Sequence, residues 1–174
     1  MSHNAFGSMS AEPLHTPRLE LEPLRVDHAA DLAPVLDDES LHEFTGGQLV
    51  TTAEMTDQFN VRVNERSPDG NEAWLNWVLR YDGQAIGYVQ ATVTKREDDL
   101  TADIAWVVAP PWQGQGFAKE AGRAMADWLL QAGVTVLAAN IHPQHDASAS
   151  VARSLGLRPT GAEVDGENRW ELRR

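Results

Sequence analysis

The 174-residue sequence contains no cysteine. This absence excludes disulfide bonds, thiolate metal sites and a cysteine nucleophile. The chain also lacks any apolar stretch near the roughly 20 residues that a membrane-spanning helix needs. Its first residues show neither the basic start nor the apolar run of a secretory signal. We therefore expect a cytoplasmic protein without a membrane partner.

Positive charge is scarce, because 14 Lys and Arg stand against 26 Asp and Glu and leave a net charge of −12. Such a field repels the phosphate backbone that nucleic-acid binders must neutralise, so we expect no nucleic-acid partner. A cationic partner is favoured instead. An anionic cofactor would have to be held by local backbone N–H groups and a few basic side chains.

The length and the 42% hydrophobic content fit one soluble domain with a single core. Residues 1–10 are small and polar without periodicity, and we expect a disordered leader or an expression remnant there. Residues 11–174 are then the single domain.

Hydrophobic patterning predicts an α+β fold in which helices cover a sheet. The expected strands share alternating or continuous apolar runs: 19–24, 74–80, 85–94, 102–109 and 134–141. Hairpin turns are expected at 81–84 and at 97–99, and residues 157–173 form a final hairpin that turns at 165–166. The expected helices share an apolar stripe and start or stop signals: 27–36 with a break near Pro34, 51–63 with a capping box, 117–131 and 147–155.

The most informative segment is a sharp turn between the strand at 102–109 and the helix at 117–131. Gly114, Gly116 and Ala118 let the backbone pass close to a ligand, and the unpaired N–H groups that open a helix favour negative charge. A dinucleotide fingerprint would want glycine in place of Lys119, and the Gly-Lys-Ser/Thr of a P-loop is absent. The turn therefore predicts a pyrophosphate site of another kind.

Four segments in order carry a family resemblance: 16–21, 86–88, the turn at 113–118, and 143–148 followed by 151–157. The turn, Gln113-Gly114-Gln115-Gly116-Phe117-Ala118, fits the pattern Gln or Arg, two residues, Gly, one residue, then Gly or Ala. Together these segments resemble the GNAT superfamily of acyl-CoA N-acetyltransferases, and within it the branch of ribosomal-protein-type N-terminal acetyltransferases. The resemblance spans residues 16–172.

The resemblance implies a three-layer α/β arrangement with a mixed, mostly antiparallel sheet of six or seven strands. Acetyl-CoA binds in that family where the fourth and fifth strands, here 102–109 and 134–141, splay apart. The pantetheine would pair with the backbone of Val107 and Val108, and the Val107 N–H would polarise the thioester carbonyl. The pyrophosphate would rest on the N–H groups of 113–118, and no metal is implied. The implied cofactor-binding residues are Val107, Val108, Gln113, Gly114, Gln115, Gly116, Phe117, Ala118, Asn140, His145 and Arg153.

Acyl transfer to an amine needs a base for the ammonium proton and an acid for the leaving thiolate. Asp103 stands where related enzymes often carry a glutamate base, and it is equally well explained as a solvated carboxylate. Many family members use a tyrosine after strand five as the acid, but this chain has only Tyr81 and Tyr88, both before it. Ser148 is then the candidate acid, a helix cap, or both. Glu43 is either an ammonium-binding group or plain surface charge.

Three implied cofactor contacts have competing structural explanations. His145 stands where the branch often has asparagine, and together with His142 it does not make a metal site without further ligands. Asn140 either bonds the pantetheine or closes its strand. Arg153 either contacts the CoA phosphates or is solvated on a helix face.

We therefore interpret the chain as an acetyl-CoA-dependent N-acetyltransferase in which a primary amine attacks the thioester directly in a ternary complex. The expected acceptor is a protein N-terminus or a small cationic amine such as a polyamine or aminoglycoside. Two alternatives stay open: a non-catalytic acyl-CoA-binding or scaffold domain, and a phosphate-ligand enzyme unrelated to acyl transfer. Exposed sheet edges would allow a homodimer.

Overall fold

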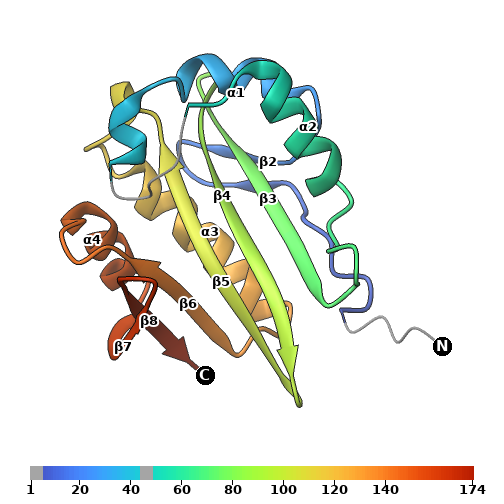
Figure 1. Ribbon diagram of the computed structural model, residues 1–174, viewed down its shortest axis with the longest axis vertical. Helices are drawn as coiled ribbons and strands as arrows, with labels where there is room; N and C mark the ends of the chain where they lie inside the picture. Colours follow the sequence, from blue (N-terminus) through green and yellow to red (C-terminus); the bar gives the residue numbers. More distant parts are fainter. Residues whose placement is uncertain (1–5, 44–48) are drawn as a thin grey trace.

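One mixed sheet with helices on both faces organises the computed structural model, which describes residues 6–43 and 49–174 (Figure 1). The strands are β1 (Leu14–His15), β2 (Glu20–Pro23), β3 (Glu72–Tyr81), β4 (Gln84–Arg96), β5 (Asp99–Val108), β6 (Val136–Ile141), β7 (Arg158–Val164) and β8 (Glu167–Arg173). The helices are α1 (His28–Val35), α2 (Thr52–Arg62), α3 (Phe117–Gln131) and α4 (Asp146–Ser154), with 3₁₀ turns η1 (Glu39–His42) and η2 (Pro110–Trp112).

The strands follow the order β1-β2-β3-β4-β5-β6-β8-β7, and every pair is antiparallel except β5 with β6. This confirms the mixed, mostly antiparallel sheet. The structure has eight strands rather than six or seven, because the two residues Leu14 and His15 pair with Leu21 and Glu20 as an extra edge.

The backbone conformation of two predicted turns explains the hairpins β3–β4 and β7–β8. Asp82 and Gly83 have φ values of 49° and 78°, so the two-residue loop between β3 and β4 has the left-handed backbone of a type I′ turn. Asp165 and Gly166, at 50° and 82°, repeat the arrangement between β7 and β8. A primed turn matches the twist of its flanking strands, and so it fixes their register.

The pairing of β5 with β6 ends early. It runs only from Thr101 opposite Val136 to Asp103 opposite Ala138, after which β6 pairs with β8 alone. In Figure 1 the two strands diverge beyond that point. The predicted splay is therefore confirmed, and it begins at Asp103.

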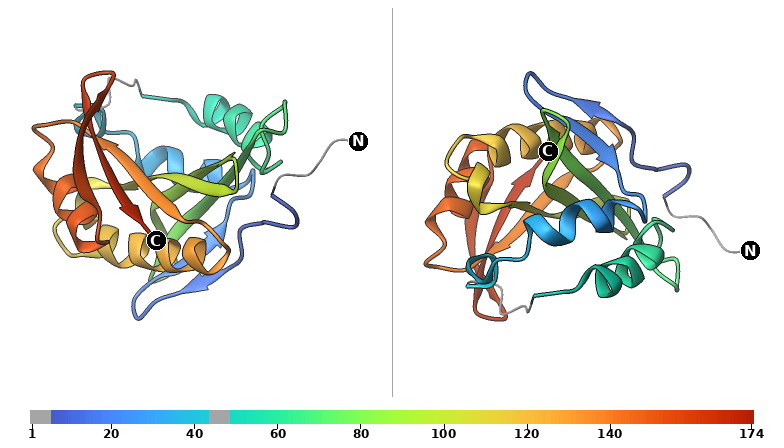
Figure 2. Two further views of the ribbon diagram at one scale, coloured as in Figure 1. Left: turned by 90° about the horizontal axis from the view of Figure 1, so that it is seen from below. Right: turned by 90° about the horizontal axis from the view of Figure 1, so that it is seen from above.

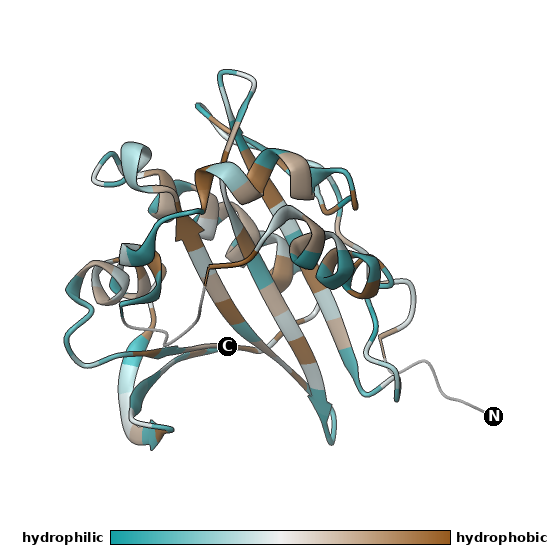
Figure 3. Ribbon diagram, turned by 45° about the horizontal axis from the view of Figure 1, so that its top comes forward, coloured by the Kyte–Doolittle hydropathy of each residue, from teal (hydrophilic) through white to brown (hydrophobic). Residues whose placement is uncertain are grey.

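The helices divide between the two faces of the sheet: α3 and α4 cover one, and α1 and α2 cover the other (Figure 2). The larger apolar cluster packs beneath α3 and includes the fully buried Trp77 and Phe117, while a smaller one joins Leu32, Phe59 and Val78 beneath α1 and α2. Figure 3 shows apolar residues along the central strands and polar ones at the hairpin tips. The alternation of the strands therefore serves two cores, one on each face.

The amino-terminal segment differs in part from the expected disordered leader, whose residues 1–5 lie outside the described part. Phe6 is buried in the larger cluster. Arg66 donates to the carbonyl of Met9 at 2.8 Å, and the Glu65 carboxylate accepts from the hydroxyl of Ser10. A buried aromatic ring and these hydrogen bonds hold residues 6–10 against the domain.

No helix among the described residues is long and apolar enough to cross a membrane.

Candidate active site

The glycine turn between β5 and α3 is held by its own first residue. The side chain of Gln113 donates from Nε2 to the carbonyl of Val108 at 2.8 Å, and its backbone N–H donates to Pro110 at 3.2 Å. Gly114 and Gly116 have φ values of 76° and 85°, a left-handed backbone that L side chains rarely adopt. Glutamine therefore braces the turn, and the two glycines let it bend into the helix.

The same turn presents a row of unused donors. Among the described residues, no protein acceptor takes the backbone N–H groups of 114–118. They lie at the amino terminus of the 15-residue α3, whose dipole favours negative charge there. These donors are the groups on which the prediction of an anion site rests, with one correction: the N–H of Gln113 donates to the Pro110 carbonyl and is not one of them.

Arg18 adds a cation beside this turn, and the sequence analysis missed it. Its guanidinium lies 4.2 Å from the centre of the Phe117 ring and pairs with Glu120 at 2.9 Å. Burial alone would raise the pKa of Glu120, but hydrogen bonds from Thr16 and Arg18 lower it overall. Arg18 therefore balances the negative charge of Glu120 in the first turn of α3. The only sign of Arg18 in the sequence was its place within residues 16–21, the first of the segments that carry the family resemblance.

The backbone of β5 alternates between its two neighbours. The N–H of Ala109 donates to Ile86, so Ala109 and, two residues back, Val107 face β4. A Cβ placed on Gly87 would lie 2.1 Å from the Val107 carbonyl oxygen, which agrees with that direction. The expected carbonyl-polarising N–H of Val107 is thus turned to β4, and Val108 is the residue whose N–H faces the splay.

Trp106 contributes a donor that the sequence did not indicate. It lies on β5 beyond the last residue paired with β6, and its backbone faces the splay by the same alternation. Its indole Nε1 is buried and has no hydrogen-bond partner among the described residues. A buried indole N–H usually finds a partner, so an unsatisfied one beside the splay suits a ligand acceptor.

At the start of the splay, the structure brings Asp103 and Asn140 together through Arg169. The Arg169 guanidinium lies 3.0 Å from Asp103 Oδ1 and 3.5 Å from Asn140 Oδ1, and it also pairs with Glu171 at 2.8 Å. The side chain of Asp103 is 41% exposed, so its carboxylate contacts solvent as well as Arg169. Arg169 lies opposite Asn140 in the β6–β8 pair, a register that sequence analysis did not supply.

The start of α4 gathers the other predicted polar groups. His145 is the N-cap residue and Ser148 is the third residue of the helix, so the explanation of Ser148 as the helix cap is wrong. Ser148 Oγ lies 3.3 Å from His145 Nε2. Burial and then the neighbouring His142 lower the pKa of His145, while Glu43 acts in the opposite direction, which places Glu43 near this group. A largely neutral imidazole beside a hydroxyl is suited to proton transfer.

Arg153 is placed differently from the rest. It lies in the last turn of α4, at the opposite end of the helix from His145, and its guanidinium is 5.3 Å from the centre of the Trp170 ring. The structure therefore gives this cation an aromatic partner of its own.

A pocket of about 250 Å³ lies between the helices α1 and α2 and the face of β3, β4 and β5 that they cover. Its apolar wall includes Leu32, Leu36, Met55, Phe59 and Val107, and its polar groups are His42, Gln58, Arg62, Asn76 and Tyr88. Glu43 is not part of the lining. The pocket borders β5 at Val107, and so it opens beside the strand that forms one edge of the splay.

Tyr88 lines this pocket, although the sequence analysis set it aside because it precedes the fifth strand. It pairs directly with Val107 across β4 and β5 and therefore shares its face of the sheet. Burial raises the pKa of the Tyr88 hydroxyl, and the charge of Arg62 acts in the opposite direction. The hydroxyl is thus protonated near neutral pH. The expected position of a tyrosine after strand five missed it because strand pairing, not chain order, brings it here.

Among the described residues, no group of three or more His, Cys, Asp or Glu is arranged to hold a metal ion.

Comparison with known proteins gives a family and a fold. The sequence model of the acetyltransferase (GNAT) domain matches residues 18–158. RimJ of Mycobacterium smegmatis, solved with a CoA disulfide, is 22% identical with a TM-score of 0.75, over 93% of this chain and 86% of that chain. A Salmonella typhimurium acetyltransferase that modifies the N-terminal serine of ribosomal protein L7/L12 is 14% identical with a TM-score of 0.77, over 94% and 99%.

A third similar structure is the aminoglycoside acetyltransferase AAC(6′)-Ib in complex with coenzyme A. It is 19% identical with a TM-score of 0.74, over 90% of this chain and 95% of that chain. At these identities the likeness concerns the fold. No curated protein sequence matches the chain.

Proposed function

This chain belongs to the GNAT acetyltransferase family, and we propose that it transfers the acetyl group of acetyl-CoA to a primary amine. The observation that carries the proposal is the row of unused N–H groups at 114–118, next to a strand that has lost its neighbour beyond Asp103. A diphosphate at a helix start and an extended arm along an open strand edge need these two features side by side.

On the donor side, the backbone N–H groups of 114–118 hold the pyrophosphate. Arg18 adds positive charge next to them, offset by its pair with Glu120. The pantetheine lies along β5 and pairs with the backbone that faces the splay, at Trp106 and Val108. The N–H of Val108 takes the place that we first gave to Val107, because Val107 is directed at β4.

The transfer is a direct displacement. The ammonium group first loses a proton, because only the neutral amine has a lone pair. The amine nitrogen then attacks the thioester carbonyl carbon and a C–N bond forms. The C–S bond breaks, the nitrogen loses its second proton to water, and the thiolate leaving group takes up a proton. Asp103 takes the proton of the ammonium group through ordered water, because it stands four residues, or about 13 Å of extended strand, before Val107. Ser148, beside His145, returns a proton to the thiolate. No covalent enzyme intermediate forms, in keeping with a chain that has no cysteine.

A non-catalytic CoA-binding domain is the second candidate, and one observation favours it. Asp103 Oδ1 is already engaged by Arg169 at 3.0 Å. If that pair holds the carboxylate away from the amine, the fold would bind CoA without turning it over.

The test is thiol release from acetyl-CoA over an amine panel, with CoA affinity measured by calorimetry on the same samples. We expect Asp103→Asn to lower kcat by about 100-fold or more, as the loss of a general base does. Its matched control is Asp99→Asn, on the same strand, where the carboxylate only accepts from Thr135.

A second pair of variants tests the acid. Ser148→Ala should lower kcat, and Ser154→Ala, on the same helix and bonded only to the Val151 carbonyl, should not. CoA binding without turnover of any amine would select the non-catalytic candidate. The absence of CoA binding would reject both functions.

A further inference from the structure

The pocket next to Val107 has a charge opposite to that of the whole protein. Its lining contains Arg62 and His42, and among the described residues it contains no carboxylate, although the chain carries 26 acidic residues. The remaining polar groups, Gln58, Asn76 and Tyr88, are neutral. A cationic acceptor would find nothing in this lining to pair with.

Arg62 is a cation without an ion pair. It is half-buried at the end of α2, and among the described residues it makes no hydrogen bond or salt bridge. Arg80, in contrast, pairs with Glu22 at 2.6 Å and with Asp31 at 2.8 Å on the same half of the sheet. A half-buried guanidinium normally finds such partners. Arg62 therefore remains available to an anion that enters the pocket.

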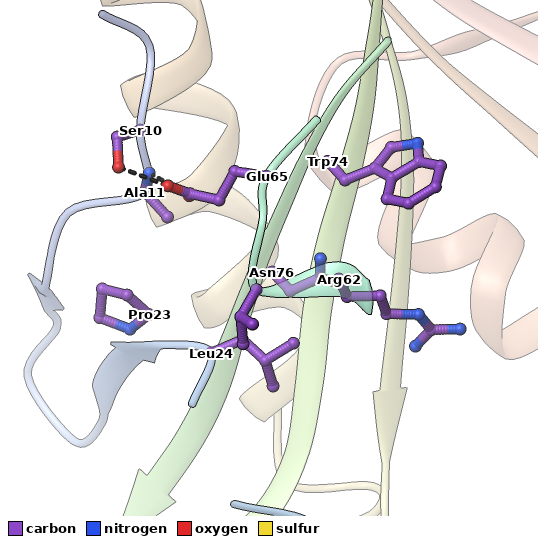
Figure 4. Close-up of a pocket in the computed structure, with 9 residues that line it drawn as sticks. Ser10, Ala11, Pro23, Leu24, Arg62, Glu65, Trp74 and Asn76 are labelled. Carbon is purple, nitrogen blue, oxygen red and sulfur yellow. Dashed lines mark hydrogen bonds between the residues drawn. The ribbon is translucent and has the colours of Figure 1, made fainter. Parts of the chain in front are cut away.

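The nearest carboxylate in sequence, Glu65, does not serve Arg62. It lines a smaller pocket of about 140 Å³ together with Arg62, but it accepts from Ser10 Oγ and from the Ala11 N–H at 2.8 Å. Figure 4 shows the Glu65 carboxylate directed at Ser10 and Ala11, while the Arg62 guanidinium extends the other way. The amino-terminal segment thus holds the acid away from Arg62.

Resting on the proposed function, we propose that the acceptor is a small amine that carries both an apolar group and a carboxylate, as an apolar α-amino acid does. The carboxylate binds Arg62, and the apolar group lies against Leu32, Met55 and Phe59. The amine then lies toward Val107 and the thioester. A volume of about 250 Å³ lies below the usual range for ligand pockets, about 300–1,000 Å³, and so suits an acceptor of this size.

This inference reverses the acceptor charge that the net charge of −12 favoured. Net charge acts over long distances and steers encounter, whereas recognition depends on the groups that line the pocket. An arginine fork matches the geometry of a carboxylate.

The test is thiol release from acetyl-CoA with amines that differ by one group. L-leucine has the amine, the apolar side chain and the carboxylate, L-leucinamide lacks the carboxylate, glycine lacks the side chain, and spermidine is purely cationic. We expect kcat/KM for leucine to exceed that for leucinamide by about 10- to 100-fold, the range for a buried charge-assisted hydrogen bond. Glycine and spermidine should both be poor acceptors.

Two variants assign that preference to Arg62. Arg62→Gln should raise KM for leucine about tenfold and leave KM for leucinamide within about twofold, so that the preference disappears. Arg62→Lys should restore part of it. The matched control is Arg96→Gln, an exposed arginine at the far end of β4, which should change neither KM. Calorimetry with CoA checks that each variant is folded and keeps its donor site.

The outcomes separate the two proposals. Thiol release that is fastest with spermidine, or equal for leucine and leucinamide, overturns the acceptor class and leaves acetyl transfer standing. An intact leucine preference in Arg62→Gln also overturns it. Thiol release with no amine at all overturns the proposed function, and the acceptor class with it.

Discussion

The glycine turn and the acceptor pocket are built in opposite ways. The turn is a run of consecutive residues whose working groups are backbone N–H donors, so its chemistry is written in the order of the chain. The pocket takes side chains from α1, α2, β3, β4 and β5: strand register brings Tyr88 beside Val107, and the packing of α2 on the sheet brings Arg62 to them. A backbone site can therefore be recognised locally, whereas a side-chain pocket needs the fold first.

The variant with the largest expected effect acts where the two regions meet. At Gly87 an added Cβ would lie 2.1 Å from the Val107 carbonyl oxygen, and backbone cannot move aside cheaply. We expect Gly87→Ala to lower the free energy of unfolding by about 3 kcal/mol and to abolish both CoA binding and turnover. Urea denaturation and calorimetry measure these. Gly83→Ala has open space around its Cβ and its left-handed backbone costs only about 1–2 kcal/mol, so it should keep both functions; loss of CoA binding there as well would remove the steric explanation.

A second variant separates the regions. Gly116 needs φ of 85° to open the turn, so Gly116→Ala should weaken CoA about 10-fold, since a left-handed residue costs about 1–2 kcal/mol. The matched control is Gly133→Ala, with φ of 103° just after α3, which carries similar strain away from the turn. The KM for the acceptor should stay unchanged in both. An equal loss of CoA affinity in the two variants would mean that strain alone, not the site, is responsible.

The same contrast explains how much the sequence could predict. Local signals were confirmed: the capping box of Thr51 and Glu54, the left-handed turn at Asp82 and Gly83, and the helix break near Pro34. The splay was also predicted, but only through the family resemblance.

What sequence reasoning missed depends on pairing across strands. Arg169 meets Asp103 because β8 lies beside β6, and Tyr88 reaches the pocket because it pairs with Val107. Neither partner is near in the chain. Ser148 was interpreted as a cap because serine is common at helix starts, whereas α4 begins at Asp146 and places Ser148 in its first turn. The polarising N–H was expected at Val107 rather than Val108. Alternation along a strand divides its residues into two sets by the direction of their backbone groups, but the sequence does not tell which set faces which neighbouring strand.

A third variant tests whether the buried indole N–H of Trp106 binds the cofactor on the donor side. Trp106 Nε1 is buried without a partner among the described residues, so Trp106→Phe should lower CoA affinity about 3- to 10-fold if that N–H binds the cofactor. The free protein should lose little stability, because the variant also removes an unsatisfied polar group. Calorimetry and urea denaturation report the two effects. Unchanged CoA affinity would mean that the indole N–H of Trp106 does not bind the cofactor, and would leave the donor side with its backbone N–H groups and Arg18.

The smallest expected effect is a pH dependence confined to the acceptor side. His28 is the first residue of α1 and is fully buried; its Nδ1 accepts from the Arg25 N–H, and its Nε2 faces Glu22 at 3.2 Å. Burial and then Arg25 lower the pKa of His28 below 6.5, so on acidification the unfolded chain takes up the proton first. The stability that a neutral His28 provides is therefore complete above about pH 6.5 and is lost as the pH falls below it.

Hydrogen exchange followed from pH 7.5 to 5.5 can assign this loss to one side of the molecule. Amides of α1 should lose protection before those of α3, because α1 begins at His28 while α3 packs on the opposite face of the sheet. In His28→Gln the early loss in α1 should disappear, and the part of the stability decline that comes from His145, whose pKa is also lowered, should remain. Simultaneous loss in α1 and α3 would mean that the two faces open as one unit, and the donor and acceptor sides would then be distinct in construction but not in stability.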